Sequence, residues 1–313
     1  MTCDLSIIIV TWNVVDYVRD CLKSVLQNTP ANLIYEIIVV DNASTDFTSS
    51  IIKNEFPQVI IIPNSSNVGF ARGNNQAISV AKGKYILFLN PDTILHENAI
   101  KIMVEFLDKN QNMGLVGPKL LDEDGSIQLA CARKFPSLLF RLTCDVMSLS
   151  SLPTIGKHLK KYLQYPYDYS VSQEVEAISG ACMLTRRESL DNTGGFGEEY
   201  IHGGEDLELC LRIKQAGLKT YYLQEAVVTH FGGRSSCQAK LRVFVNSILS
   251  DQIYYLKSFG RIHGILYRLI IQLIGIPCII VIGFIKFLVG AETIQDYKFR
   301  LNLVRGLLQW KAI

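Results

Sequence analysis

The stretch that decides the fold is Lys84–Thr93, with the sequence KYILFLNPDT. Its first half, Tyr85–Leu89, is an apolar run between a glycine and Asn-Pro, and this pattern predicts a buried strand. The strand delivers two oxygen-bearing side chains, Asn90 and Asp92, to a fixed position at its carboxyl end. Mg²⁺ and Mn²⁺ prefer oxygen ligands, usually one or two carboxylates together with substrate phosphates. We therefore expect Asp92 to hold such an ion and a diphosphate; an ordinary Asn-Pro-Asp turn is the alternative.

Apolar runs of the same kind recur upstream and alternate with helical patterns. Strands are predicted at Leu5–Val10, Glu36–Val40 and Val59–Ile62. Helices are predicted at 14–27 and 71–81, and a further helix is predicted between them with Ser44 as its N-cap. Continuous apolar strands that alternate with helices indicate an α/β fold with a mostly parallel sheet covered on both faces. Ligands bind outside the carboxyl ends of such strands. The residues predicted there are Thr11, Trp12, Asn13, Asp41, Asn42, Asn90 and Asp92.

The second half of the body is less regular, with a loop-rich insertion at 121–172. A helix is predicted at 98–109, and strands at 115–117, 175–184, 219–223 and 227–229. Gly180 lies in the second of these strands among small residues, which let a ligand or another backbone come close. A further helix is predicted to begin at Glu205 and Asp206, where carboxylates favour the helix dipole. Acidic capping alone would explain this pair, and that is the alternative to a catalytic role.

The composition indicates a globular body with a different C-terminal part. The 313 residues are 49% hydrophobic and 19% charged, which excludes a disordered chain. From Leu241 onward there are nine Lys and Arg against three Asp and Glu, whereas the remainder has 22 against 26. An acidic body with a basic, apolar tail favours a membrane surface over nucleic acid as partner. The eight cysteines lack the spacing of a zinc or redox site, so we expect reduced core residues in the cytosol. The chain enters a strand almost at once, and we expect no signal peptide.

Ile265–Ala291 is the most apolar part of the chain. It contains 17 consecutive residues without a charge, which as a helix would span about 25 Å, just short of a hydrocarbon core. Gly275 and Pro277 in its middle also fit a kinked or hairpin-like insertion, and a buried core helix is a further alternative. We expect a catalytic domain at 1–240 and a helical, membrane-associating region at 241–313.

Six short motifs follow one another along the body. They are SIIIVTWN (6–13), VVDNASTD (39–46), NVGFARGNN (67–75), LNPD (89–92), SGA (179–181) and GEDLEL (204–209). In this order they resemble the motifs of inverting family-2 glycosyltransferases, particularly bacterial rhamnosyltransferase-like members. The resemblance covers Leu5–Ser236. It implies the GT-A nucleotide-diphospho-sugar transferase fold, followed here by a helical, apolar extension.

The resemblance also implies roles for residues at these motifs. Contacts with the nucleotide-sugar are expected from Thr11, Asn13, Asp41, Asn42, Arg72, Asn74, Asn90, Arg234 and Ser235. Asp92 and His230 would hold Mg²⁺ or Mn²⁺. Asp206 would be the catalytic base, with Glu205 beside it, and Gly180 and Glu205 would contact the acceptor. Position 90 carries Asn where the family has the first Asp of a D-x-D pair, which leaves Asp92 as the direct metal ligand.

The reaction implied is the transfer of a sugar, with rhamnose as a candidate, from a dTDP- or UDP-linked donor to a saccharide or lipid-linked saccharide. A base takes the proton of the acceptor hydroxyl while that oxygen attacks the anomeric carbon. The metal and Arg234 would stabilise the departing nucleoside diphosphate. We expect the protein at the cytoplasmic face of the membrane, where it would act in cell-surface polysaccharide synthesis. The sequence leaves open whether the protein forms a homodimer.

Other classes of function fit the residues less well. A dinucleotide-binding oxidoreductase needs G-x-G-x-x-G after the first strand, where the chain has Thr11–Val14. A phosphatase with an aspartyl nucleophile needs a carboxylate at position 90. A catalytically inactive, membrane-bound partner or scaffold with the same fold is the remaining alternative. The presence of Asp92, Glu205, Asp206 and His230 argues against it.

Overall fold

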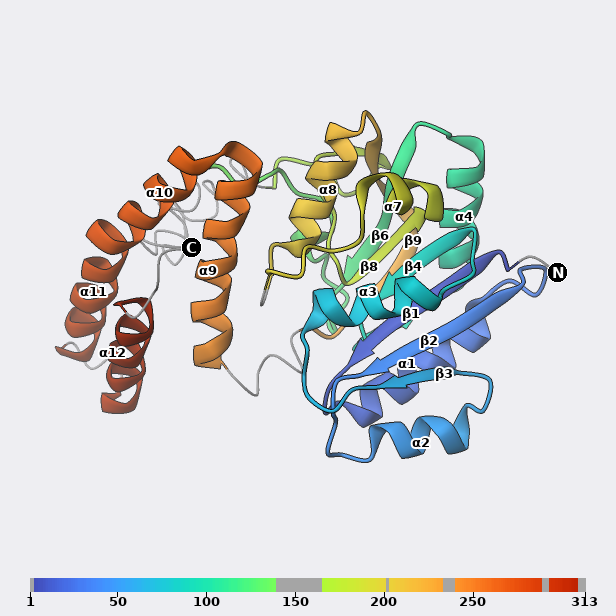
Figure 1. Cartoon of the computed structure of the whole chain (residues 1–313), viewed down its shortest axis with the longest axis horizontal. Helices are drawn as coiled ribbons and strands as arrows, with labels where there is room; N and C mark the ends of the chain where they lie inside the picture. The colour runs from blue at the N-terminus through green and yellow to red at the C-terminus, as the bar shows by residue number, and fades with distance from the viewer. Residues whose placement is uncertain (1–2, 139–164, 201–202, 233–239, 289–292, 309–313) are drawn as a thin grey trace. The chain divides into compact units, whose positions relative to one another are not determined.

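The computed structural model describes residues 3–138, 165–200, 203–232, 240–288 and 293–308. The chain divides into two compact units (Figure 1). Unit 1 comprises Met1–Arg133, Tyr167–Tyr200 and Glu205–Gln238, and unit 2 comprises Lys134–Pro166, Ile201–Gly204 and Ala239–Ile313. The predicted boundary between a catalytic domain and a helical region after residue 240 stays a prediction.

Unit 1 is built on one nine-stranded sheet with the order β3-β2-β1-β4-β8-β6-β9-β5, and β7 pairs with β9. The strands are β1 (Leu5–Thr11), β2 (Tyr35–Asp41), β3 (Ile60–Pro63), β4 (Tyr85–Leu89), β5 (Thr93–Leu95), β6 (Met113–Leu121), β7 (Gln173–Val175), β8 (Cys182–Arg186) and β9 (Lys219–His230). β1 to β4 are parallel, as are β6 and β9, while β5, β7 and β8 run antiparallel to their neighbours. The predicted α/β class is therefore confirmed.

Helices pack around this sheet (Figure 1). They are α1 (Val15–Asn28), α2 (Thr48–Glu55), α3 (Phe70–Val80), α4 (Ala99–Lys109), α7 (Arg187–Thr193) and α8 (Glu205–Gln215). Helix α3 packs on β1 and β2, and α4 packs on β6, β8 and β9. Every residue of β1 and β4 is buried, so these strands have no polar face and their sequences do not alternate.

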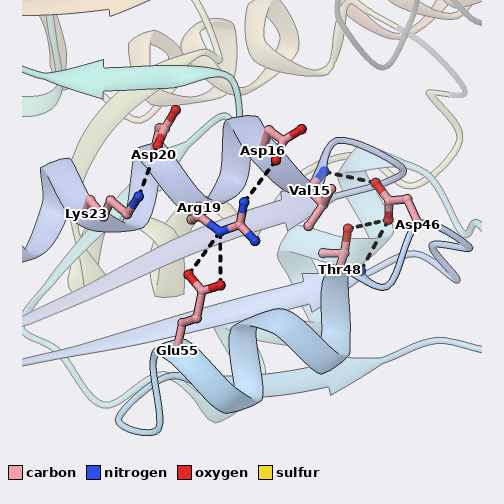
Figure 2. Close-up of polar contacts among 8 residues, drawn as sticks. All are labelled: Val15, Asp16, Arg19, Asp20, Lys23, Asp46, Thr48 and Glu55. Atoms are coloured by element: carbon pink, nitrogen blue, oxygen red, sulfur yellow. Dashed lines mark hydrogen bonds and ion pairs between the residues drawn. The ribbon is translucent and has the colours of Figure 1, made fainter.

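Asp46, the last residue of the VVDNASTD motif, caps the first two helices. One of its carboxylate oxygens accepts from the N–H of Val15 at the start of α1 (2.9 Å), and the other accepts from the hydroxyl and N–H of Thr48 at the start of α2 (Figure 2). A carboxylate there satisfies free N–H groups and favours both helix dipoles. The prediction of a Ser44 cap is wrong, because α2 begins four residues later, at Thr48, and the Ser44 hydroxyl instead accepts from the N–H of Asn13.

Two strand predictions in the second half also differ from the structure. The single strand expected at 175–184 is two strands, and Ser179-Gly180-Ala181 lies in the connection between β7 and β8. The reason is that β7 pairs with β9 whereas β8 lies between β4 and β6, so the chain must leave one position in the sheet and cross to another. The two strands expected at 219–223 and 227–229 are one strand, β9, with an irregular register beside β6.

The described cysteines, Cys3, Cys21, Cys131, Cys182, Cys210 and Cys278, are free thiols. Four of them are buried, and burial raises the pKa of the Cys131 thiol to about 11 and of the Cys210 thiol to about 12. The prediction of free core cysteines is confirmed for these four.

Unit 2, in its described part, contains α9 (Lys240–Phe259), α10 (Arg261–Ile270), α11 (Ile276–Leu288) and α12 (Ile294–Leu308). Helix α10 packs on α9, and α12 packs on α9 and α11 (Figure 1). A π-helical turn at Ile271–Gly275 joins α10 to α11. It accommodates Pro277, which lacks an N–H and crowds the preceding turn of a regular helix. Arg261–Val281 is long and apolar enough to cross a membrane, and 28% of its most apolar part is buried.

Candidate active site

The carboxyl ends of β1 and β2 lie side by side, because Thr11 and Asp41 are register partners in this parallel pair. The N–H of Asn42 donates to the carbonyl of Thr11 (2.9 Å), which holds the two ends together. Thr11, Asp41 and Asn42 are all buried. The hydroxyl of Thr11 has no hydrogen-bond partner among the described residues. A buried hydroxyl without a partner is destabilising, so this atom is suited to a ligand that would satisfy it.

The side chains of Asp41 and Asn13 shape the loops that carry them. One carboxylate oxygen of Asp41 accepts from the N–H of Ser44 (3.0 Å), and the other accepts from the hydroxyl of Ser49. Asn13 has a left-handed backbone at φ 52°, and its side chain accepts from the N–H of Thr45 (2.7 Å). A nucleotide contact with Asp41 would therefore use the lone pairs that these loop hydrogen bonds leave.

The predicted contacts near α3 differ in how accessible they are. Asn42 accepts from the side chain of Asn64 (2.9 Å), and Asn74 donates to a carbonyl one turn earlier in α3. Both amides are buried and are used within the fold. Arg72 is 59% exposed and pairs with Glu198 (3.0 Å). Of these three side chains, Arg72 can therefore leave its protein partner for a phosphate with the smallest loss of stability.

Asn90, Asp92 and His230 converge at the end of β4. Pairing of β5 with β9 brings them together, since Thr93 is the register partner of His230. The Nε2 of His230 lies 3.4 Å from Oδ1 of Asp92 and 3.3 Å from Nδ2 of Asn90. Within the described ranges, no group of three or more His, Cys, Asp or Glu side chains is arranged so that it could hold a metal ion by itself. One carboxylate and one imidazole fit an Mg²⁺ or Mn²⁺ ion that takes its other ligands from a diphosphate and water.

Gln128 contacts His230 and was missed by the sequence reasoning. Its amide nitrogen donates to the carbonyl of His230 (2.7 Å), and its amide oxygen lies 2.9 Å from Nδ1 of the same residue. Gln128 belongs to the segment 122–133, which leaves β6 and folds back on it through the N–H of Gln128 and the carbonyl of Leu120 (2.9 Å). The segment was predicted only as a loop-rich insertion, because no motif marks it.

Three donors hold the carboxylate of Asp206, the second residue of α8. Oδ2 accepts from Nη2 of Arg133 (2.5 Å) and from the N–H of Gly180 (3.1 Å), and Oδ1 accepts from the N–H of Leu207 (2.8 Å). The side chains of Arg133 and Asp206 are only 15% and 14% exposed. A Cβ added to Gly180 would lie 3.2 Å from Cβ of Asp206. The structure therefore brings the expected base and one expected acceptor residue together, next to an arginine that carried no predicted role.

The other predicted residues are placed as follows. Glu205 is the first residue of α8, beside Asp206. Arg234 and Ser235 lie outside the described residues, so their expected contacts with the diphosphate stay predictions. No sequence pattern predicted a role for Arg133, because Asp206, which it contacts, is far away in the chain. The backbone pairing of Arg133 with Ala177 brings it near α8.

Comparisons with known proteins agree on the family and the fold. The family description "Glycosyl transferase family 2" matches residues 6–194, and "N-terminal domain of galactosyltransferase" matches residues 161–232. N-acetylglucosaminyl-diphospho-decaprenol L-rhamnosyltransferase of Mycobacterium tuberculosis is 26% identical over 247 residues, which are 75% of this chain and 78% of the relative. Rhamnosyltransferase WbbL of Escherichia coli is 27% identical over 264 residues, 80% of this chain and 96% of the relative.

A solved structure resembles the whole chain. The mannosyltransferase of Pyrobaculum calidifontis, in complex with GDP-Man and Mn²⁺, aligns with a TM-score of 0.56 at 14% identity. The alignment covers 98% of this chain and 86% of the mannosyltransferase. At this identity the likeness concerns the fold alone, and it confirms the predicted GT-A fold.

Proposed function

Because the chain belongs to glycosyl transferase family 2, we propose that it transfers rhamnose, with inversion, from a dTDP- or UDP-linked donor to a saccharide or lipid-linked saccharide. The names of the two bacterial relatives support the choice of sugar, and the mycobacterial name includes a lipid-linked acceptor. We assign the reaction to cell-surface polysaccharide synthesis. The observation that carries this proposal is the carboxylate of Asp206, which three donors hold in place beside Gly180.

Asp206 acts as the general base in this proposal. An ionised carboxylate has about four lone-pair sites, and the described donors use two on Oδ2 and one on Oδ1. The remaining site on Oδ1 takes the proton of the acceptor hydroxyl while that oxygen attacks the anomeric carbon. The C–O bond to the nucleoside diphosphate breaks in the same displacement, on the opposite face of the sugar. Arg133 and the N–H of Gly180 keep the carboxylate from turning away.

The donor lies at the carboxyl ends of β1, β2 and β4 in this proposal. Thr11 and Asp41 contact the nucleoside, and the unsatisfied Thr11 hydroxyl supports a ligand there. Asp92 and His230 would hold Mg²⁺ or Mn²⁺, which would supply positive charge to the leaving diphosphate. Arg72 is exposed and exchanges Glu198 for a phosphate oxygen. The Mn²⁺ in the mannosyltransferase complex supports a metal in this fold.

Unit 2 binds the cytoplasmic surface of a membrane in this proposal. An exposed apolar stripe extends over α10, the π-helical turn and α11, and its members are Ile262, Ile265, Leu266, Leu269, Leu273, Val281, Phe284, Ile285 and Leu288. Water-exposed apolar side chains on this scale are unusual for a protein that has no partner there. Exposed Arg261 and Lys257 stand at the same end of the stripe and would attract anionic lipid.

A binding and turnover experiment tests the proposal. Purified full-length protein is heated with dTDP-, UDP- and GDP-sugars, with and without Mn²⁺, and a donor that binds the folded state raises the melting temperature. We expect dTDP-rhamnose or a UDP-sugar to stabilise the protein only with Mn²⁺. Asp92→Asn should lose this metal dependence, while Asp206→Asn should bind the donor normally and turn over about 10²-fold more slowly.

A matched control is Asp16→Asn, which changes an exposed carboxylate on α1 and should affect neither property. Unchanged turnover in Asp206→Asn would reject the base assignment. A protein that binds a donor yet neither transfers nor hydrolyses it under any condition would favour the inactive scaffold.

A further inference from the structure

We propose that Gln128 is a positioning residue that fixes the imidazole of His230 with its proton on Nδ1, so that Nε2 presents a lone pair toward Asp92. The inference deepens the proposed function, since it rests on Asp92 and His230 as ligands of the divalent cation. Gln128 lies on the segment 122–133, which is outside the six sequence motifs.

The orientation of the Gln128 amide follows from its neighbours. One end of the amide contacts two groups that only accept hydrogen bonds, the carbonyl of His230 (2.7 Å) and Oδ1 of Asp122 (2.7 Å). That end must therefore be the NH₂ group. The other end is then the carbonyl oxygen, which can only accept. It lies 2.9 Å from Nδ1 of His230, so Nδ1 must carry the proton.

The consequence for Nε2 follows from the same reasoning. A neutral imidazole with a proton on Nδ1 has a lone pair on Nε2. Nδ2 of Asn90, a donor, lies 3.3 Å from Nε2 and is compatible with that lone pair. Oδ1 of Asp92 is an acceptor at 3.4 Å, which is beyond the usual length of an N–H···O bond. Two acceptors that face each other in a nearly dry site are suited to a cation between them, which would take the Nε2 lone pair in place of the Asn90 N–H.

The backbone around Gln128 is rigid enough for this role. Leu121 and Ile127 form a bridge, and the N–H of Asp122 donates to the carbonyl of Ser126 (2.7 Å). The side chains of His230 and Asp92 are 13% and 7% exposed, so water competes little for these contacts. Partners that orient a metal-binding histidine through its second nitrogen typically change metal affinity by about 10–100-fold when they are lost.

The experiment measures the tautomer and the metal affinity separately. Full-length protein labelled with ¹⁵N-histidine is examined without metal at pH 8 by long-range ¹H–¹⁵N NMR, and His230→Asn identifies the signal among the five histidines. Mn²⁺ alone is then titrated and the free ion is counted by electron paramagnetic resonance. We expect the Nδ1-protonated pattern for His230 in the wild type, and a mixture of tautomers with about 10–100-fold weaker Mn²⁺ binding in Gln128→Leu.

Two variants sharpen the test. Gln128→Glu combined with Asp122→Asn keeps an acceptor for Nδ1–H without setting two carboxylates against each other, and should keep the tautomer even if Gln128→Leu folds poorly. Ser126→Ala disturbs the same hairpin without touching His230 and should behave like the wild type. Wild-type tautomer and Mn²⁺ affinity in Gln128→Leu would overturn this inference and leave the proposed function intact. Absence of Mn²⁺ binding by the wild type, or equal binding by Asp92→Asn, would overturn the metal site as well.

Discussion

The ion pair between Arg133 and Asp206 offers a quantitative test of how the expected base is held. Replacing Arg133 by Met removes the guanidinium and leaves the carboxylate with two backbone donors. Exposed ion pairs are worth about 0–1 kcal/mol, whereas breaking a buried pair costs about 3–5 kcal/mol. These side chains are 15% and 14% exposed, close to the buried limit, and the two remaining donors reduce the loss. We expect Arg133→Met to lower the free energy of unfolding by about 2–3 kcal/mol.

A double-mutant cycle separates the interaction energy between Arg133 and Asp206 from the other effects of each substitution on the free energy of unfolding. The variants are Arg133→Met, Asp206→Asn and the double substitution, and each is unfolded in urea. All carry Trp310→Phe, so that the fluorescence of Trp12 reports the unfolding of unit 1. The expected coupling energy is about 1–2 kcal/mol. A coupling energy below about 0.5 kcal/mol would refute the argument, because it would mean that the pair does not hold the carboxylate in solution.

A surface arginine provides the matched control. Arg19 on α1 pairs with Glu55 and Asp16, whose side chains are 41% and 83% exposed (Figure 2). Arg19→Met should therefore lower the free energy of unfolding by less than about 1 kcal/mol. A similar loss in Arg19→Met and Arg133→Met would show that burial does not set the difference.

Three further predictions concern other parts of the chain. Gly180→Ala places a methyl group 3.2 Å from Cβ of Asp206, so turnover should fall at least about tenfold while the melting temperature changes little; unchanged turnover would separate this loop from the base. Burial raises the pKa of the Cys21 and Cys210 thiols to about 12, so at pH 8 about one molecule in 10⁴ carries the thiolate; native protein should resist iodoacetamide at both positions and urea-unfolded protein should react. Leu273 is 71% exposed on the apolar stripe, so Leu273→Glu should weaken flotation with anionic liposomes about tenfold or more; equal flotation would point to another surface.

The half of the site on parallel strands could be predicted because sheet geometry is regular. Parallel strands that end together bring Thr11 beside Asp41, whatever the loops do afterwards. The approach of His230 to Asp92 was expected from family resemblance, and its physical cause is an antiparallel pairing of β5 with β9 that the sequence did not reveal. Short strands of three residues, such as β5, carry too little pattern to be recognised.

The missed residues have a common cause. Gln128 and Arg133 lie on a segment without helical or strand periodicity, so no local signal predicts where their side chains point. Their positions depend on long-range contacts, with His230 in one case and with Ala177 and Asp206 in the other. The Ser44 cap failed for a local reason, because α2 begins later, at Thr48, where the nearer Asp46 accepts from the free N–H.

One segment therefore supports both halves of the proposed chemistry. Within 122–133, Gln128 contacts the histidine of the expected metal site, and five residues later Arg133 contacts the expected base. The hydroxyl of Tyr169 lies 2.7 Å from the carbonyl of Ala132 and 2.9 Å from that of Leu129, and its one proton serves these two acceptors between Gln128 and Arg133. Since both contacts depend on the same backbone, a shift of this segment would disturb His230 and Asp206 together. The spacing between His230 of the expected metal site and the expected base Asp206 thus depends on a stretch that carries none of the six motifs.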